Sequence, residues 1–330
     1  MRNFLRYFLS RIGQAIIVLF VVSAIAFSIY QFAGDPTDNM ISQSTTPEQQ
    51  EQLRESLGLN DPIYIQYGRF ITNAMHGDFG NSWRNGQPVA EIIVESLPAT
   101  IELAAAAFIF ALIIGIPLGV WTALYPKNPL SKLGNVFALL GVSVPSFVIA
   151  SLLIYYFSVI LADTWLAMPA IGRGETVNIL GWESGFFTTD GLKHLIMPAI
   201  SLGLYQVTLI MRLVRSGMRE VLQTDYIRFA RARGLAPNVI NYKHALKNTL
   251  VPVITVMGMQ IGGLIAFSVV TETIFNWPGV GNLFIKSFGF NDFPFISAYL
   301  LMVAVVFVAV NLAVDMLYFI IDPRLRRNNI

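Results

Sequence analysis

Long apolar runs without interruption dominate the hydrophobic pattern of this chain. Each run is close to the ~20 residues that a helix needs to cross a bilayer, and none alternates as a barrel strand does. Six runs are therefore expected to form membrane-spanning helices, and they cover residues 13–33, 100–124, 133–161, 195–211, 249–275 and 296–321. The pattern predicts an all-α polytopic membrane protein.

Composition supports this fold class. Hydrophobic residues make up 55% of the 330 residues and charged residues only 13%, whereas an ordinary soluble domain is about 25% charged. So few charges could not cover the surface of a soluble protein of this length. The chain has no cysteine, which excludes a disulfide framework and thiol chemistry.

Basic residues gather on one side of the predicted spans. The N-terminus, the connections after the second and fourth spans, and the C-terminus together hold 16 of the 22 Lys and Arg residues. The positive-inside rule places these segments in the cytoplasm, and an even number of spans then puts both termini there. The first apolar run continues past Ala26, which is too long for a signal peptide, so a retained helix is expected.

The segment between the first two spans is expected to fold into short helices outside the membrane. Thr46-Pro-Glu-Gln49 has the pattern of a capping box with proline at the first helical position, and Gly58 would end that helix after Leu57. Asp61-Pro62 can start a second helix, which Gly77-Asp-Phe-Gly80 would end in a turn. The sequence leaves open whether this segment binds a partner or is only a packed loop.

A second external segment, residues 162–193, is rich in aromatic residues. It holds Trp165, Trp182, Phe186 and Phe187. These side chains suit either anchors at the membrane interface or the mouth of a path, and the pattern leaves both open.

We divide the chain into three parts on this basis. Residues 1–33 form an N-terminal stub with the first helix, residues 34–98 form the external helical segment, and residues 99–330 form a membrane domain with five helices. The membrane domain includes a cytoplasmic loop at residues 216–248 between the fourth and fifth spans.

Small residues and prolines within the spans indicate close packing and bends. Gly115-Ile-Pro-Leu-Gly119 and Gly258-Met-Gln-Ile-Gly262 follow the pattern that lets two helix backbones approach closely. Four prolines can bend spans where neighbouring groups satisfy the freed carbonyls. They are Pro117, Pro145, Pro198 and Pro252.

Signatures of enzymatic chemistry are absent from the sequence. No phosphate-binding Gly-x-x-x-x-Gly-Lys loop occurs, and Gly279-Val-Gly281 is predicted to be a turn after Trp277-Pro278 without a following helix. The three histidines lack metal-ligand spacing, and no nucleophile–base set or carboxylate pair marks a hydrolytic site. We expect a protein that is not an enzyme and binds no metal or cofactor itself.

Acidic residues in or near the spans keep one alternative open. Glu102, Glu272 and Asp315 could couple transport to protons or ions, as in a secondary transporter. Glu102 and Glu272 lie close to span ends, and Asp315 can pair with a nearby basic residue.

The connection between the fourth and fifth spans is expected to form a helical elbow. Thr224 or Asp225 can cap a helix that continues to Arg233, and Gly234 can adopt the left-handed conformation that ends it sharply. Pro237 then permits a new helix that runs into the fifth span. Such a rigid elbow favours a mechanical link to a soluble partner.

The side chains of this elbow are expected to be amphipathic. An apolar stripe is predicted from Met218, Leu222, Tyr226 and Phe229. The basic residues Arg228, Arg231 and Arg233 lie largely off this stripe. A basic loop that lies on anionic lipid is the alternative interpretation.

An ordered set of short motifs along almost the whole chain carries a family resemblance. The motifs are Gly34-Asp-Pro36, Leu57-Gly-Leu59, Asp61-Pro62, Gln66-Tyr67, Gly77-Asp-Phe-Gly80, Leu97-Pro-Ala-Thr-Ile-Glu-Leu103, Gly141-Val-Ser-Val-Pro-Ser-Phe147, Met218-Arg-Glu-Val-Leu222, Asp225-Tyr-Ile-Arg228, His244-Ala-Leu-Lys-Asn248, Thr271-Glu-Thr-Ile-Phe-Asn-Trp-Pro-Gly279 and Asp322-Pro-Arg324. With them, the chain resembles the membrane-spanning permease subunit of a bacterial ABC importer of the dipeptide/oligopeptide/nickel family, and most of all its B-type peptide permease.

The resemblance gives the elbow a role. Permeases of ABC importers carry a Glu-Ala-Ala…Gly…Ile-x-Leu-Pro motif, of which Ala230, Gly234 and Leu246 follow the general pattern here. The resemblance implies that the helix before Gly234 sits in a groove of an ATP-binding subunit. The implied docking residues are Tyr226, Arg228, Phe229, Ala230, Arg231, Gly234, Leu235, His244 and Asn248. Pro145, Ser146, Glu272 and Trp277 are the candidates for the path or its gate.

The resemblance also implies the partners. We expect a homologous second permease in a heterodimer, two ATP-binding subunits that hold the ATP and Mg²⁺, and a periplasmic or lipid-anchored binding protein that delivers the substrate. The expected location is the bacterial inner membrane. The expected cargo is a di- or oligopeptide, with nickel or glutathione as the alternative cargo.

Overall fold

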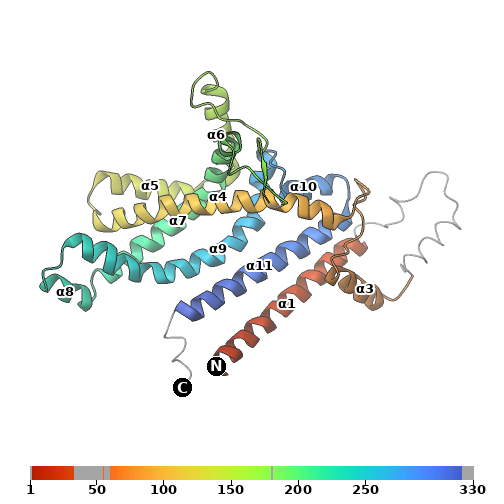
Figure 1. Cartoon of the computed structure of the whole chain (residues 1–330), viewed down its shortest axis with the longest axis horizontal. Helices are drawn as coiled ribbons and strands as arrows, with labels where there is room; N and C mark the ends of the chain where they lie inside the picture. The colour runs from red at the N-terminus through yellow and green to blue at the C-terminus, as the bar shows by residue number, and fades with distance from the viewer. Residues whose placement is uncertain (1, 33–54, 56–59, 180, 322–330) are drawn as a thin grey trace.

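The computed structural model describes residues 2–32, 55, 60–179 and 181–321, and nearly all of its regular structure is helical (Figure 1). The long elements are α1 (Arg2–Phe32), α4 (Val89–Leu124), α7 (Thr189–Val221), α9 (Lys247–Ile274) and α11 (Phe293–Ile321). The shorter helices are α3 (Ile63–Met75), α5 (Pro129–Ser143), α6 (Ser146–Ile154), α8 (Asp225–Ala232) and α10 (Val280–Gly289). Two π-helical segments, η2 (Tyr155–Ile160) and η3 (Val239–Leu246), and two strands, β1 (Val177–Ile179) and β2 (Trp182–Ser184), complete the described structure.

The all-α membrane architecture predicted from the sequence is confirmed. Five helices are long and apolar enough to cross a membrane, and a bent pair formed by α5 and α6–η2 would be the sixth span. Helices α4 and α7 begin before the apolar runs that predicted them, because helical hydrogen bonding continues into more polar sequence. The predicted external helix at residues 46–57 lies outside the described residues apart from Glu55, as do the residues from Asp322 onward.

The third predicted span is not one continuous helix. The chain turns by 109° between α5 and α6, at Val144 and Pro145, so the prediction of a single helix at 133–161 is wrong. Proline has no N–H to bond the carbonyl four residues earlier, and here the helix ends rather than bends. In contrast, Pro117, Pro198 and Pro252 lie inside continuous helices.

The small residues pack as predicted. A β-carbon on Gly119 of α4 would lie 2.7 Å from the Cβ of Val214 on α7, and one on Gly262 of α9 would lie 2.8 Å from the Phe307 ring of α11. Both distances are too short for a methyl group, so glycine permits these helix pairs to touch along their backbones. This contact sets α4 against α7 and α9 against α11.

The segments beyond the apolar runs contain structure that the sequence did not reveal. The prediction that no helix follows Gly279-Val-Gly281 is wrong, because Gly279 is the N-cap residue of α10. Residues 162–193 contain the antiparallel β1–β2 pair, with Asn178 opposite Glu183. The second predicted external helix is confirmed as α3, which follows Pro62.

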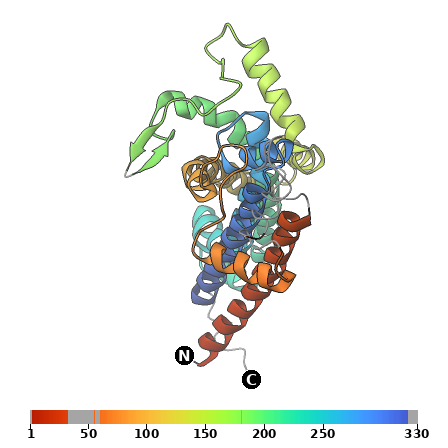
Figure 2. The same cartoon turned by 90° about the vertical axis from the view of Figure 1, so that its right-hand side faces the viewer.

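The connecting segments lie at two opposite ends of the helices. Figure 1 shows the start of α1, the end of α11, the α4–α5 connection and α8 toward one end, which we call the α8 end. Helices α3 and α10 lie toward the other, which we call the α10 end. Figure 2 shows α6 and the β1–β2 hairpin projecting from the bundle in different directions. The long helices α4, α7, α9 and α11 thus connect two ends that present different chemistry.

Candidate functional site

The predicted elbow at the α8 end is present and ends at Gly234. Helix α8 follows Thr224, whose hydroxyl donates to the Val221 carbonyl at 2.6 Å instead of capping α8. Gly234 has φ of +75°, and its N–H donates to the Arg231 carbonyl at 2.9 Å. A β-carbon on Gly234 would meet no atom within 4 Å, so glycine is needed here for its backbone conformation and not for space.

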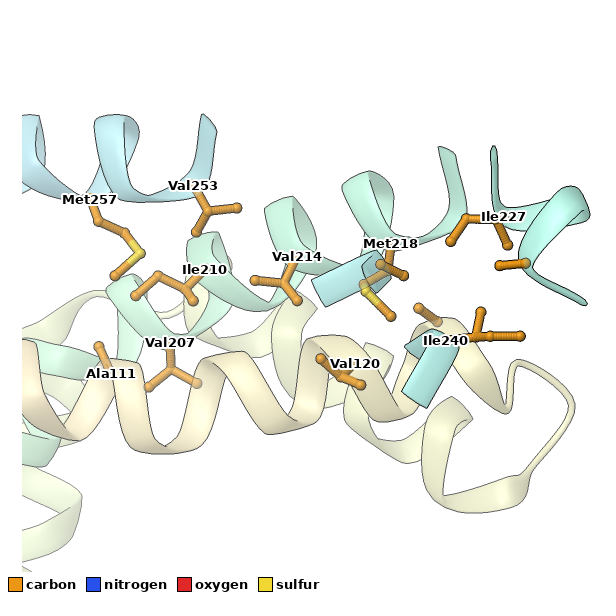
Figure 3. Packing of buried hydrophobic residues seen from close by; sticks show 13 residues of the cluster. Ala111, Val120, Val207, Ile210, Val214, Met218, Ile227, Ile240, Val253 and Met257 are labelled. Carbon is orange, nitrogen blue, oxygen red and sulfur yellow. The ribbon is translucent and has the colours of Figure 1, made fainter. Parts of the chain in front are cut away.

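The inner face of α8 packs into the membrane helices. Ile227 is fully buried and Ala230 nearly so, and both belong to a core cluster that continues through α7, α4 and α9. Figure 3 shows the Ile227 side chain close to those of Met218 on α7 and Ile240 on η3. The inner face of α8 is therefore part of the same packed core as the membrane helices.

The predicted apolar stripe is wrong beyond Leu222. Tyr226 and Phe229 are 42% and 63% exposed, whereas Ile227 and Ala230 are buried in their place. Helix α7 ends at Val221, and the turn before α8 changes the helix axis, so the periodicity of α7 does not extend into α8.

The outer face of α8 combines exposed apolar and basic side chains. We use this name for Tyr226, Arg228, Phe229, Arg231, Arg233 and Leu235, all of which are exposed. The guanidinium carbon of Arg233 lies 5.3 Å from the centre of the Phe229 ring. Aromatic side chains flanked by arginine are enriched at the centres of protein interfaces.

Two further predicted residues lie where α8 meets the start of α9. The side-chain amide of Asn248 donates to the Tyr226 hydroxyl at 2.7 Å. His244 is partly buried in η3, the π-helical segment that leads into α9. The structure therefore brings the predicted docking residues together around one helix, and Ala230 alone among them is buried.

The four candidate path residues fall into two groups. Pro145 and Ser146 line a cavity of about 480 Å³ between the α5–α6 break, α7 and α9. Glu272 and Trp277 do not line this cavity, and both are fully buried at the α10 end. The structure does not bring the four residues to one place.

Glu272 and Trp277 hold the start of α10 against α4. The Glu272 carboxylate accepts hydrogen bonds from the Ser268 hydroxyl at 2.8 Å and the Asn282 N–H at 3.0 Å. The Trp277 indole N–H donates to the Ala99 carbonyl at 2.8 Å. These groups lock the connection between α9 and α10.

A buried ion pair at the same end was missed by the sequence analysis. The guanidinium of Arg173 donates to one oxygen of Glu102 at 2.8 and 2.5 Å. The other Glu102 oxygen accepts from the Gly185 and Phe186 N–H groups at 2.7 and 2.8 Å. The pair ties the β1–β2 region to α4. The sequence signal that could have indicated this pair is a single arginine between two glycines, Gly172-Arg-Gly174, in a segment that is otherwise notable for its aromatic residues.

The remaining acidic span residue is also paired. The Asp315 carboxylate lies 3.0 Å from the Arg11 guanidinium, so α11 and α1 are linked at the α8 end. Among the described residues, no group of His, Asp or Glu side chains is arranged to hold a metal ion. A larger cavity of about 980 Å³ between α1, α3, α4 and α11 has an almost wholly apolar lining. It offers few groups that could orient a polar ligand.

Comparisons with known proteins agree with this arrangement. Residues 115–327 match the family described as "Binding-protein-dependent transport system inner membrane component", and residues 4–104 match the corresponding N-terminal family. A solved structure of the MetNI methionine ABC transporter in inward facing conformations has a TM-score of 0.53 and 19% identity. It covers 70% of this chain and 96% of that chain, and it shows the likeness of the fold alone.

Similar curated proteins span nearly the whole chain. "Dipeptide transport system permease protein DppB" of Alkalihalophilus pseudofirmus is 39% identical, over 98% of this chain and 99% of the relative. "Oligopeptide transport system permease protein AppB" of Bacillus subtilis is 40% identical, over 97% and 98% respectively. "Glutathione transport system permease protein GsiC" of Escherichia coli is 34% identical, over 98% and 99%. The chain therefore belongs to the binding-protein-dependent transport system inner membrane component family, as a membrane-spanning permease subunit of an ABC importer and not an enzyme.

Proposed function

We propose that this chain forms part of the path by which an ATP-driven importer carries di- or oligopeptides across the inner membrane of a bacterium. The assignment of the cargo is supported by relatives that are similar over nearly the full length and are named dipeptide and oligopeptide permeases. The assignment of the energy coupling is supported by α8, whose outer face is exposed while its opposite face packs against the rest of the chain.

The outer face of α8 suits a groove on an ATP-binding subunit. Phe229 and Tyr226 offer apolar area, and the arginines around them would favour an acidic rim on the partner. Closure of two ATP-binding subunits would move α8, and the buried contacts of Ile227 and Ala230 would pass this movement to α7 and α9. Access to the cavity next to α7 and α9 would then switch from one side of the membrane to the other.

The proposed assembly contains this chain and a homologous second permease. Two ATP-binding subunits hold the ATP and Mg²⁺, and a periplasmic or lipid-anchored binding protein delivers cargo at the α10 end. The α8 end and both termini are cytoplasmic in this arrangement. The concentration of Lys and Arg in the connections at the α8 end supports this orientation.

Proton or ion coupling is disfavoured by the placement of the acidic groups. Glu102 is paired with Arg173 and Asp315 with Arg11, and Glu272 is hydrogen-bonded at the α10 end. None of the three lines the cavity next to Pro145. Glutathione is itself a tripeptide, and the similarity to a glutathione permease keeps it among the peptide cargoes to be tested.

Transport by the reconstituted complex tests the proposal. The chain is purified with its partner permease and ATP-binding subunits, placed in proteoliposomes, and supplied with loaded binding protein. We expect ATP-dependent accumulation of labelled di- and oligopeptides, with glutathione and Ni²⁺ as competing cargoes. Accumulation of Ni²⁺ without peptide would overturn the assigned cargo, and peptide uptake driven by a proton gradient without ATP would overturn the coupling.

A further inference from the structure

The cavity at the break in the third span is lined by uncharged polar groups. It has a volume of about 480 Å³, within the range of about 300 to 1,000 Å³ that is usual for ligand sites. Its polar lining residues are Ser146, Ser201, Tyr205, Gln206 and Gln260. None of the described lining residues is charged. The cavity therefore offers hydrogen bonds without offering an ion pair.

Gln206 lies on the cavity wall, and its side-chain amide makes no hydrogen bond within the described part of the chain. It is only 7% exposed and lies near the middle of α7. Within the same described residues, no hydrogen bond to the side-chain amide of Gln260 on α9 is found either. Neither amide is among the described side-chain atoms that are buried without a partner, so both amides are open to the cavity and available to a group that enters it.

The break in the third span forms part of the same wall. Pro145 has no N–H, so the Gly141 carbonyl four residues earlier receives no helical hydrogen bond from it. Both residues line the cavity. The wall thus combines the end of a helix with carboxamide side chains, and each carboxamide can match both the donor and the acceptor of a peptide bond.

We propose that this cavity is a subsite for the main-chain amide groups of peptide cargo, with Gln206 and Gln260 as its hydrogen-bonding residues. This inference rests on the proposed function and specifies which chemical group of the cargo the path contacts. A neutral lining does not select for charged side chains on the cargo. Each peptide offers amides whatever its sequence, so the subsite would accept peptides of different composition.

Substitution of the two glutamines tests the proposal in the complete complex. Gln206→Leu and Gln260→Leu are made singly and together, and Gln14→Leu is the control, at an exposed position of α1 where the side chain accepts a hydrogen bond from Arg11. We expect the double variant to lose about tenfold in initial peptide uptake, since two hydrogen bonds are removed. The stimulation of ATP hydrolysis by loaded binding protein should stay within about twofold, and Gln14→Leu should behave as the wild type.

Thermal unfolding separates a binding role from a structural one. Leucine replaces an amide that makes no hydrogen bond within the described part of the chain, so the unfolding temperature of the Gln206→Leu variant should hold or rise while uptake falls. A fall in unfolding temperature in parallel with uptake would show that Gln206 supports the fold, and would overturn the subsite. Gln206→Asn keeps the carboxamide and should retain more uptake than Gln206→Leu.

A change in the cargo completes the test. The peptide bond of a labelled dipeptide is replaced by an ester, which removes the N–H donor, and delivery is compared at saturating loaded binding protein. The ester should be imported more slowly than the amide by the wild type, and this difference should shrink in the double variant.

The two proposals fail in different ways. If the double variant imports the dipeptide at the wild-type rate, the subsite is wrong and the peptide function stands. If the wild-type complex imports no peptide of any length, the proposed function is wrong and the subsite falls with it.

Discussion

At the α8 end of the bundle the arginines next to Phe229 are exposed to solvent, whereas at the α10 end Arg173 and its partner Glu102 are buried. At the first end the ion pairs are at least partly exposed, as between Arg228 and Asp225 and between Arg11 and Asp315. At the second end each oxygen of Glu102 is hydrogen-bonded, and Glu272 and Trp277 are buried nearby with partners of their own.

This difference separates the proposed docking surface on α8 from a region whose buried contacts hold its own loops in place. A buried charge is tolerated only when it is paired, so the contacts at the α10 end keep its loops in one arrangement. An exposed aromatic and basic helix contributes little to the chain's own stability but offers binding energy to a partner. Substitutions at the α10 end should therefore unfold the protein, and those on the outer face of α8 should uncouple it.

The largest expected effect comes from breaking the buried ion pair. Arg173→Met removes the cation beside a Glu102 carboxylate that is 1% exposed, and it should destabilise the protein. Loss of one partner of a buried pair costs about 3–5 kcal/mol. Thermal unfolding in detergent and the yield of folded protein measure the effect.

Arg228→Met is the control for this prediction. Arg228 is also paired, with Asp225 at 3.3 Å, but both side chains are exposed. The unfolding temperature of the Arg228→Met variant should match that of the wild type. Equal unfolding temperatures for Arg173→Met and Arg228→Met would show that the α10 end is not held as described.

Two positions on α8 compare the two roles within one helix. Ile227→Ala empties a fully buried site, and such truncations cost about 2–5 kcal/mol of folding free energy. Phe229→Ala removes an exposed side chain, so its effect on folding should stay within about 0.5 kcal/mol. Docking to the ATP-binding subunit should weaken by about 2 kcal/mol, or about 30-fold in Kd, as for an interface hot spot.

Unfolding temperature and Kd, measured on both variants, decide between these roles. If Phe229→Ala destabilised the chain and left Kd unchanged, the assignment of the outer face would be wrong.

A smaller effect on stability than that of Arg173→Met or Ile227→Ala is expected at the end of the elbow. Gly234→Val forces a branched side chain into φ of +75°, which costs roughly 1–2 kcal/mol. Insertion should persist, but the stimulation of ATP hydrolysis by loaded binding protein should fall, because the end of α8 shifts. Gly234→Asn tolerates this conformation better and should retain more stimulation.

Gly86→Val is the matched control. Gly86 lies just before the start of α4, at the α10 end. Gly86 has φ of +67° and, like Gly234, open space where a β-carbon would be. The strain is comparable, but the position is remote from α8. Loss of stimulation in both variants would point to general destabilisation instead of a role for the elbow.

The parts of the fold that were predicted from sequence are those with local causes. The apolar runs predicted the spans, the spacing of Gly115 and Gly119 predicted a close helix contact, and Gly234 predicted the end of α8. In each case the residue's own chemistry, either hydrophobicity, size or backbone freedom, is sufficient.

The parts that were missed depend on residues far apart in the chain. The sequence places Glu102 close to a span end but does not predict its ion pair, because its partner Arg173 is 71 positions away. Gln206 and Gln260 carry no signal in the sequence, because an uncharged amide within an apolar run does not indicate whether it lines a cavity. At Pro145 the sequence indicates a bend within one helix, whereas in the structure the helix ends and the chain turns by 109°.

By itself the sequence determined the class of protein, the number and order of apolar runs, the elbow before Gly234 and the absence of nucleotide-binding chemistry. These follow from hydrophobicity and backbone conformation, which act within one helix or one turn. Only the tertiary structure decided which face of α8 is free, which charges are paired and which residues line the cavity. Those properties depend on the packing of α4, α7 and α9 against one another, because burial and hydrogen bonding are set by neighbours in space.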